Sequence, residues 1–190
     1  DLLGIKPATV TSMLKKLREK ELITYQRYGK VALTPIGNAS ALLVIRKHRL
    51  WESFLVNALH FTWDEVHEVA EQLEHIQSEK LINKLDAFLS FPKVDPHGDP
   101  IPDLYGNMPI LPTTTMLEMD IASFATIVAV KKSNPTFLME LEQIGIHIHT
   151  KVQLIAIDMK HQRIHVNIQE NKEIQLPFEI ATNLIIQTIS

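Results

Sequence analysis

The stretch PATVTSMLKKLREKELITYQRYGKVALTPIG, residues 7–37, decides the fold of the first part of the chain. Pro7 is typical of the first turn of a helix, where its missing N–H would have no partner. The apolar residues that follow recur at the spacing of one helix face: Val10, Met13, Leu14 and Leu17. We expect this face to be buried. Gly4 is a plausible end of a preceding helix, and two helices around such a tight turn match helix-turn-helix spacing.

A short β-hairpin is predicted after this helix. Leu22 to Arg27 and Val31 to Thr34 read as two strands, with Tyr28-Gly29-Lys30 as the turn between them. A helix-turn-helix followed by a basic hairpin is a winged helix-turn-helix. Thr34-Pro35 then has the N-cap and first-turn residues of a long helix, which we expect to extend to about Leu59.

Charge is distributed unevenly, although the net charge of the 190-residue chain is only −3. Residues 1–49 carry ten Lys or Arg and three acids, whereas the remainder carries nine Lys or Arg and nineteen acids. A basic head suggests a polyanion partner, with chance clustering on a solvated surface as the alternative. For a winged helix the partner is double-stranded DNA. The candidate contacts lie at the helix start and on the wing: Lys6, Ala8, Thr9, Thr11, Ser12, Arg27, Tyr28 and Lys30.

The composition excludes several classes of protein. With no cysteine, the chain has no disulfide framework and no thiolate metal site. No apolar run approaches the roughly 20 residues that a membrane-spanning helix needs, and the chain does not start with a signal peptide. We therefore expect a cytoplasmic protein with no membrane partner.

A second stretch, HEVAEQLEH at residues 67–75, lies in a segment from about Asp64 to Leu89 that reads as one amphipathic helix. At about 100° per residue, four polar side chains share one stripe about 100° wide. They are His67, Glu71, Glu74 and His75. The stripe borders the apolar face, where carboxylates are costly unless they are paired or bind a metal.

The preceding helix contains RKHRLWE, residues 46–52, in which His48 and Glu52 lie one turn apart on one face. Two helices joined by a short connection can bring this pair and the HEVAEQLEH stripe together. The combined set is sufficient for two metal sites of imidazole and carboxylate character. A network of structural salt bridges is the alternative.

The chain resembles the diphtheria-toxin-repressor family of metal-dependent transcriptional regulators, including its manganese-responsive branch. The resemblance rests on VTSMLKKLREKELITY, LTPIG, RKHRLWESFL, VHEVAEQLEHIQS and HGDPIP, which occur in the family's order within residues 1–106. It implies an ancillary metal site made by His48, Glu52 and His67. It also implies a primary, activating site that contains Glu71, Glu74 and His75.

The resemblance also implies a metal and a mechanism. The toxin-repressor branch has a cysteine at the position of Glu71, and a glutamate there resembles the manganese branch. Hard oxygen ligands favour Mn²⁺ or Fe²⁺, while affinity alone allows Zn²⁺ in vitro. In the family, a first helix that is absent from this sequence completes the primary site, and metal ties the DNA-binding head to the dimer helices. A homodimer that reads a palindromic operator follows, with a candidate dimer surface of Leu81, Ile82, Leu85 and Phe88. The alternative is that these four residues pack only inside one chain.

The last part of the chain is predicted to be rich in β-strands. Six of the ten prolines fall between Phe91 and Pro112, which indicates an ordered turn or linker. His97 in this segment is expected to be a structural turn residue, with a metal ligand as the less favoured alternative. ATIVAVK, VQLIAID, RIHVNIQ and NLIIQTI then read as strands, interrupted by a short helix around Phe137 to Ile144. This part resembles the SH3-like, FeoA-type barrel of some family members. Its loop KKSNPTF lacks the acid with which such barrels contribute to the ancillary site. His147 and His149 are expected to be exposed strand histidines.

These observations predict an α+β protein with four regions. They are a winged helix-turn-helix domain that is partial at its N-terminus (1–36), a helical metal-binding and dimerisation domain (37–92), a Pro-rich linker (93–112) and a FeoA/SH3-like β-barrel (113–190). The expected function is a Mn²⁺- or Fe²⁺-dependent DNA-binding regulator, a homodimeric repressor of metal-uptake genes and not an enzyme. The alternatives are a metal-independent winged-helix regulator and, less favoured, a di-metal carboxylate enzyme, because the two Glu-x-x-His motifs of such bundles are not present.

Overall fold

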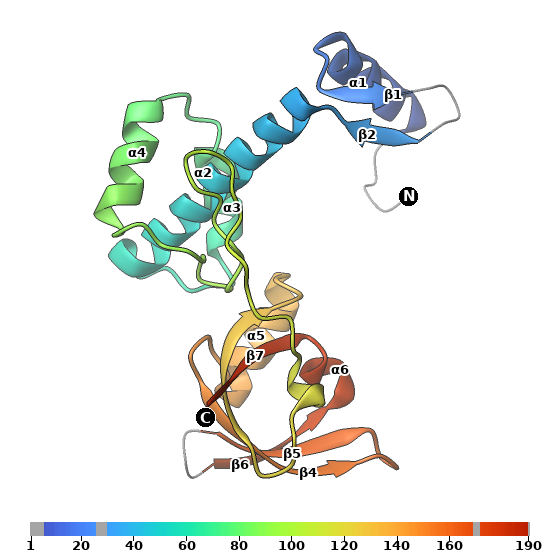
Figure 1. The fold of residues 1–190 in the computed structure, drawn as a ribbon, viewed down its shortest axis with the longest axis vertical. Coiled ribbons are helices and arrows are strands. Elements are labelled where there is room, and N and C mark those ends of the chain that lie inside the picture. Colours follow the sequence, from blue (N-terminus) through green and yellow to red (C-terminus); the bar gives the residue numbers. More distant parts are fainter. Residues whose placement is uncertain (1–5, 26–29, 169–171, 190) are drawn as a thin grey trace. The chain divides into compact units, whose positions relative to one another are not determined.

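The computed structural model describes residues 6–25, 30–168 and 172–189 (Figure 1). The chain divides into two compact units. The first contains Asp1–Arg46 with Pro102–Asn107, and the second contains Lys47–Ile101 with Met108–Ser190. Within the described ranges, no helix combines the length and the apolar character needed to cross a bilayer.

The first unit contains the predicted helix and hairpin. Helix α1 (Pro7–Glu19) is followed by strands β1 (Ile23–Tyr25) and β2 (Val31–Leu33). The two strands pair antiparallel, with Ile23 opposite Leu33. This order of helix and hairpin confirms the winged-helix prediction for the described residues.

The expectation that α1 buries one face is wrong. No residue of this helix is buried, and Met13 is 51% exposed. The physical reason is that, in the described part of the unit, α1 packs mainly against the three-residue strand β1, which is too short to cover its apolar face. The predicted turn at Tyr28-Gly29 and the predicted helix end at Gly4 lie outside the described residues.

Thr34 caps helix α2 (Pro35–Leu59), as the sequence predicts. Its hydroxyl accepts a hydrogen bond from the backbone N–H of Gly37 (2.9 Å) and donates one to the carbonyl of Glu21 (2.6 Å). One side chain therefore satisfies an N–H that has no partner inside the helix and also ties the helix start to the segment before β1.

Replacing Thr34 with alanine should lower the free energy of unfolding by about 0.5–2 kcal/mol, because both hydrogen bonds are lost. Urea unfolding followed by circular dichroism measures this change. Thr34→Ser keeps the hydroxyl and is the control, with a much smaller loss expected. An alanine variant as stable as the wild type would show that the cap contributes nothing.

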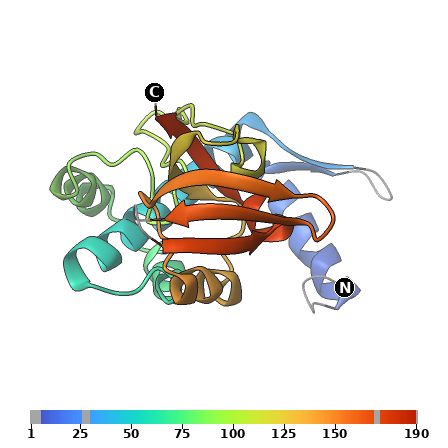
Figure 2. The same ribbon diagram turned by 90° about the horizontal axis from the view of Figure 1, so that it is seen from below.

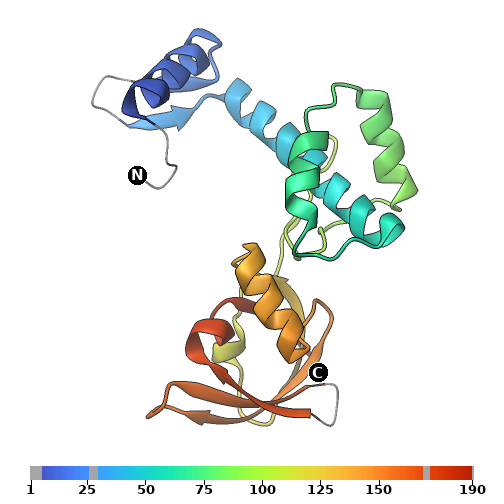
Figure 3. The ribbon, with the colours of Figure 1, turned by 180° about the vertical axis from the view of Figure 1, so that it is seen from behind.

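Helix α2 continues into the second unit, where α3 (Val66–Leu73) and α4 (Glu79–Phe88) lie beside it (Figure 3). The prediction of one helix from Asp64 to Leu89 is wrong, because the chain breaks between α3 and α4. Ser78 has an extended backbone, and its hydroxyl accepts a hydrogen bond from the N–H of Leu81 (3.3 Å), so it starts a new helix.

The helices share an apolar core around Leu50, which is fully buried. Two of the four predicted dimer residues belong to this core: Ile82 is 4% exposed and Leu85 is 6% exposed. The prediction is wrong for these two, because the break before α4 turns them toward α2 and α3 instead of outward. Leu81 and Phe88 are 41% and 67% exposed and remain available to a second copy.

The rest of the second unit is a five-stranded antiparallel sheet that curls around its own apolar core (Figure 2). The strand order is β6-β5-β4-β3-β7. The elements are η1 (Met116–Glu118), β3 (Phe124–Val130), α5 (Pro135–Ile144), β4 (Lys151–Asp158), β5 (Arg163–Ile168), β6 (Lys172–Pro177), α6 (Phe178–Ala181) and β7 (Leu184–Ile189). The predicted small β-domain and its short helix are confirmed. Strand β6 was not predicted, because its sequence KEIQLP has little apolar character.

The prediction of His147 and His149 on one strand face is wrong. Both lie in the connection between α5 and β4, before the strand begins at Lys151. His149 has a φ of 70°, which a strand residue does not adopt.

Candidate metal centre

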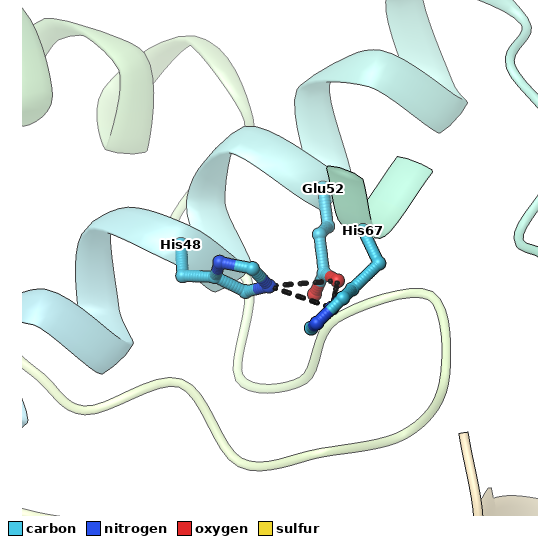
Figure 4. Close-up of side chains that lie close together, drawn as sticks. All are labelled: His48, Glu52 and His67. Atoms are coloured by element: carbon cyan, nitrogen blue, oxygen red, sulfur yellow. Dashed lines mark hydrogen bonds and ion pairs between the residues drawn. The ribbon is translucent and has the colours of Figure 1, made fainter. Parts of the chain in front are cut away.

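Three of the predicted ligands converge where α2 faces α3 (Figure 4). His48 and Glu52 lie one turn apart on α2, and His67 comes from the first turn of α3. His48 Nε2 is 3.0 Å from Glu52 Oε1 and 3.1 Å from His67 Nδ1. His67 Nδ1 is 3.4 Å from Glu52 Oε1. The set expected for the ancillary site is therefore brought together as one cluster.

His48 also contacts a residue of the set expected for the primary site. Its Nδ1 lies 2.7 Å from Oε2 of Glu74, the C-cap residue of α3. One imidazole thus joins the two sets through its two nitrogens. Glu71 and His75 are exposed and are not part of any ligand cluster found among the described residues. Because α3 ends at Leu73, the continuous polar stripe expected from a longer helix does not form.

The cluster is shielded from solvent on the α2 side and open at His67, and its charges interact. The side chains of His48, Glu52 and Glu74 are 15%, 3% and 13% exposed, whereas that of His67 is 60% exposed. Burial alone would lower the pKa of His48, but hydrogen bonds to Glu52 and Glu74 and their negative charges outweigh it and raise the pKa above its ordinary 6.5. Burial would raise the pKa of Glu52, yet the contact with His48 lowers it. The lowered pKa of Glu52 favours its carboxylate form, and the raised pKa of His48 favours a proton on the ring that competes with a metal.

The donor set fits a divalent transition metal. Imidazole nitrogens and carboxylate oxygens are ligands for Mn²⁺, Fe²⁺ and Zn²⁺. One ligand atom from each of His48, Glu52 and His67 lies within 4.8 Å of the others. These atoms come from two helices, so a metal bound by all three would crosslink α2 to α3.

We expect the Mn²⁺ affinity of this centre to rise with pH. The metal needs neutral imidazole, and the raised pKa of His48 extends proton competition above pH 6.5. Below that raised pKa, affinity should fall by about tenfold per pH unit, because one proton is displaced. Calorimetric Mn²⁺ titrations between about pH 6 and 8 measure this slope, and a pH-independent affinity would contradict it.

The metal-free protein should show the opposite trend. A folded-state pKa that is raised means that the ion pairs of His48 stabilise the fold fully below pH 6.5 and lose this effect as the pH rises through the raised pKa. Thermal unfolding in the presence of a chelator measures this trend over the same pH range.

The candidate DNA contacts on α1 are exposed. Lys6 is the N-cap residue, and its side chain makes no capping hydrogen bond. The hydroxyl of Thr11 donates to the carbonyl of Pro7 (3.0 Å), which leaves its oxygen able to accept. The other exposed candidates are Ala8, Thr9, Ser12 and Lys30. Arg27 and Tyr28 lie outside the described residues.

Three of the ten basic residues among residues 1–49 make contacts within the protein, so their charges are not presented to a polyanion. Arg46 and Lys47 are 5% and 7% exposed, and each donates to a backbone carbonyl. Arg49 pairs with Asp95 at 3.5 Å. The motif RKHR is therefore largely a scaffold around His48, and the exposed cations of the described head belong to α1 with its flanking residues and to Lys30.

His97, for which the sequence favoured a structural turn role over that of a ligand, lies near the centre. It lies in a turn, as expected, but it is 3% exposed and its Nδ1 is 3.8 Å from Glu52 Oε2. Its sequence neighbours are ordinary turn residues, so no local signal indicates this contact.

A winged helix, a helical domain with a His/Glu metal centre and a small β-barrel together define the class of metal-responsive winged-helix proteins. Three family models match the chain. They are the iron dependent repressor N-terminal DNA binding domain over residues 1–31, the iron dependent repressor metal binding and dimerisation domain over residues 34–103, and the FeoA domain over residues 114–188.

Similarity to individual proteins supports the same family. A solved structure described as a manganese-dependent transcriptional repressor complex with manganese aligns with a TM-score of 0.83 and 33% identity, over 98% of this chain and 87% of that chain. The iron-dependent repressor IdeR of Mycobacterium leprae (strain TN) is 36% identical over 96 residues, 50% of this chain and 42% of that protein. A probable metal transport system membrane protein of Chlamydia trachomatis is 45% identical over 71 residues, 37% of this chain and 16% of that protein. The chain spans less than half the length of these two curated relatives. It belongs to the family of iron- and manganese-dependent repressors.

Proposed function

We propose that the chain is the DNA-binding and metal-sensing part of a homodimeric repressor that Mn²⁺ or Fe²⁺ activates. The observation that carries this proposal is the position of His48. Its two nitrogens contact ligand candidates of both metal sites, Glu52 with His67 on one side and Glu74 on the other. We assign His48, Glu52 and His67 to the ancillary site, and Glu71, Glu74 and His75 to the primary site.

The metal would act by stabilising one arrangement of the helices relative to others. Helix α2 begins directly after the wing strand β2 and carries His48 and Glu52 further along. A metal that crosslinks α2 to α3 stabilises the arrangement in which its ligands converge. If DNA binds that arrangement better, metal shifts the population toward it, and metal and DNA reinforce each other's binding.

The head would bind double-stranded DNA through the residues at the start of α1 and on the wing. Lys6, Arg27 and Lys30 suit phosphates, whereas the small hydroxyl residues suit the major groove. A two-fold dimer would place two such heads on a palindromic operator. Leu81 and Phe88 are the exposed apolar residues that we assign to the dimer surface. A regulator of this kind would act in the cytoplasm, in contact with the DNA that it regulates.

The oxygen-rich ligand set supports Mn²⁺ or Fe²⁺ as the physiological metal, with Zn²⁺ binding in vitro. The similarity to part of a metal transport system protein supports metal uptake as the regulated process. We retain residues 1–36, 37–92, 93–112 and 113–190 as the proposed DNA-binding, metal-binding, linker and barrel regions.

DNA binding by the full-length protein tests the proposal. Selection from random duplexes with Mn²⁺ and with chelator, at one fixed salt concentration, identifies the bound sequence. Fluorescence anisotropy then gives the affinity for that sequence with Mn²⁺, Fe²⁺ and Zn²⁺. We expect an enriched palindrome and an affinity that metal increases by roughly 10–100-fold. Equal binding with and without metal would overturn the proposal and favour a metal-independent regulator whose histidine cluster is a salt-bridge network.

A further inference from the structure

The start of helix α2 is hydrogen-bonded to the turn that follows α1. In this turn, the N–H of Glu21 donates to the carbonyl of Arg18 (2.9 Å), and the N–H of Leu22 donates to the carbonyl of Leu17 (3.0 Å). Thr34, which caps α2, contacts the same two turn residues. Its hydroxyl donates to the carbonyl of Glu21 (2.6 Å), and its N–H donates to that of Leu22 (3.0 Å). Hydrogen bonds therefore connect the end of the helix that carries the candidate DNA contacts to the first turn of α2.

Gly37 brings these two segments into direct backbone contact. It is buried, and a Cβ added to it would lie 1.8 Å from the carbonyl oxygen of Leu22 and 2.7 Å from its carbonyl carbon. Both are backbone atoms, so no flexible side chain can move aside to make room. The same oxygen accepts the hydrogen bond from the N–H of Thr34. Helix α2 can therefore lie this close to the turn only with a glycine at position 37.

A hinge at this junction is the competing explanation for the glycine, because hinges need residues that tolerate large changes of φ and ψ. The contacts argue against it. Gly37 lies inside α2, and its N–H donates to the hydroxyl of Thr34 (2.9 Å). The junction thus depends on the missing side chain of Gly37 and not on its conformational freedom. It holds α1, the turn and the start of α2 together.

The same helix leads from this junction to the metal centre. Helix α2 is unbroken from Pro35 to Leu59 and includes His48 and Glu52 (Figure 1). After Gly37 it contains no further glycine and no proline, the residues at which helices usually kink. A change in the orientation of α2 at its ligands can therefore reach α1 through the backbone contact at Gly37.

We propose that Gly37 is a positioning residue that fixes α1 on the start of α2, so that the DNA-binding helix follows the metal-dependent arrangement of α2. Gly37 belongs neither to the two ligand sets nor to the candidate DNA contacts. Its replacement should leave both binding surfaces in place but remove the effect of one ligand on the other, since coupling requires an element that both sites bias. The inference rests on the proposed function, because it requires that metal strengthens DNA binding.

The test compares DNA binding by the full-length wild-type protein and by its Gly37→Ala variant, on the selected DNA, with Mn²⁺ and with chelator. The wild type should gain roughly 10–100-fold in affinity with Mn²⁺, whereas the variant should gain less than about threefold. Calorimetry without DNA should give the same Mn²⁺ affinity for both proteins. DNA should raise the Mn²⁺ affinity of the wild type but not that of the variant, because the coupling is reciprocal. A general loss of stability would instead weaken DNA binding in chelator or Mn²⁺ binding without DNA.

A second variant keeps the test decisive if Gly37→Ala does not fold. Thr34→Val removes the hydroxyl that joins Glu21 to Gly37 without adding a group at the close contact. It should lose part of the gain in DNA affinity with Mn²⁺, and Thr34→Ser should restore that part. Ser40→Ala changes an exposed residue of the same helix and is the control, with the wild-type gain expected.

The outcomes separate the inference from the proposed function. A folded Gly37→Ala protein that keeps the wild-type gain, or that loses Mn²⁺ affinity without DNA, overturns the inference alone. A Thr34→Val protein with the full wild-type gain does the same. A wild-type protein that binds DNA equally well with and without Mn²⁺ overturns the proposed function and the inference together.

Discussion

Replacing His48 with alanine should abolish the effect of Mn²⁺ on DNA binding. The substitution removes both nitrogens through which His48 contacts Glu52 and His67 on one side and Glu74 on the other, so both proposed ligand sets lose the imidazole that they share. We expect the affinity for the selected DNA in Mn²⁺ to fall to the metal-free level, a loss of roughly 10–100-fold. Anisotropy titrations with and without Mn²⁺ measure the effect, and calorimetry measures the loss of bound metal.

Two further variants separate this result from a general effect on the protein. His48→Gln keeps a polar group beside the buried Glu52, so a loss of metal response in a variant that melts like the wild type is a loss of ligation. His161→Ala removes a histidine with a 62% exposed side chain from the turn after β4 and should leave the response unchanged. A His48→Ala protein that still gains DNA affinity with Mn²⁺ would remove this residue from the mechanism.

Gly98→Ala should be the most destabilising single change in the turn between the helices and the barrel. Gly98 has a φ of +84°, which costs an alanine about 1–2 kcal/mol. The new Cβ would also lie 2.2 Å from the oxygen of Val128 and 2.4 Å from Cα of Ala129, where neither backbone atom can yield. We expect a total loss of about 2–5 kcal/mol, measured by urea unfolding.

Gly145→Ala is the matched control for this prediction. Gly145 has a φ of +83°, but the nearest atom to an added Cβ is the flexible Lys172 Nζ at 3.5 Å. This variant should therefore lose only the conformational part, about 1–2 kcal/mol. Equal losses in the two variants would mean that the close approach of Gly98 to β3 is relieved at no cost, and that the turn is not firmly attached to the barrel.

Much of the fold follows from local pattern. Pro7, Thr34 and Pro35 mark helix starts that the structure confirms, and the β-branched runs of the barrel form β3, β4, β5 and β7. Prediction from local pattern failed at two places, where the signal for the true structure was less evident in the sequence than the pattern around it. The helical pattern from Asp64 to Leu89 continues through Ser78, but Ser78 is a better N-cap than a mid-helix residue, and the chain begins a new helix there. Strand β6 has no pattern of its own and forms because β5 offers it a partner.

The sequence by itself predicted the winged helix, the barrel and the shared helix face of His48 and Glu52, because each depends on residues a few positions apart on one helix face, in one turn or in one strand. Only the tertiary structure shows which histidine contacts both expected ligand sets and which side chains surround the carboxylate of Glu52. The pairing of His48 with Glu74 and the approach of His97 to Glu52 join residues on different elements. Their distances depend on how the elements pack against one another, and no local periodicity encodes that packing.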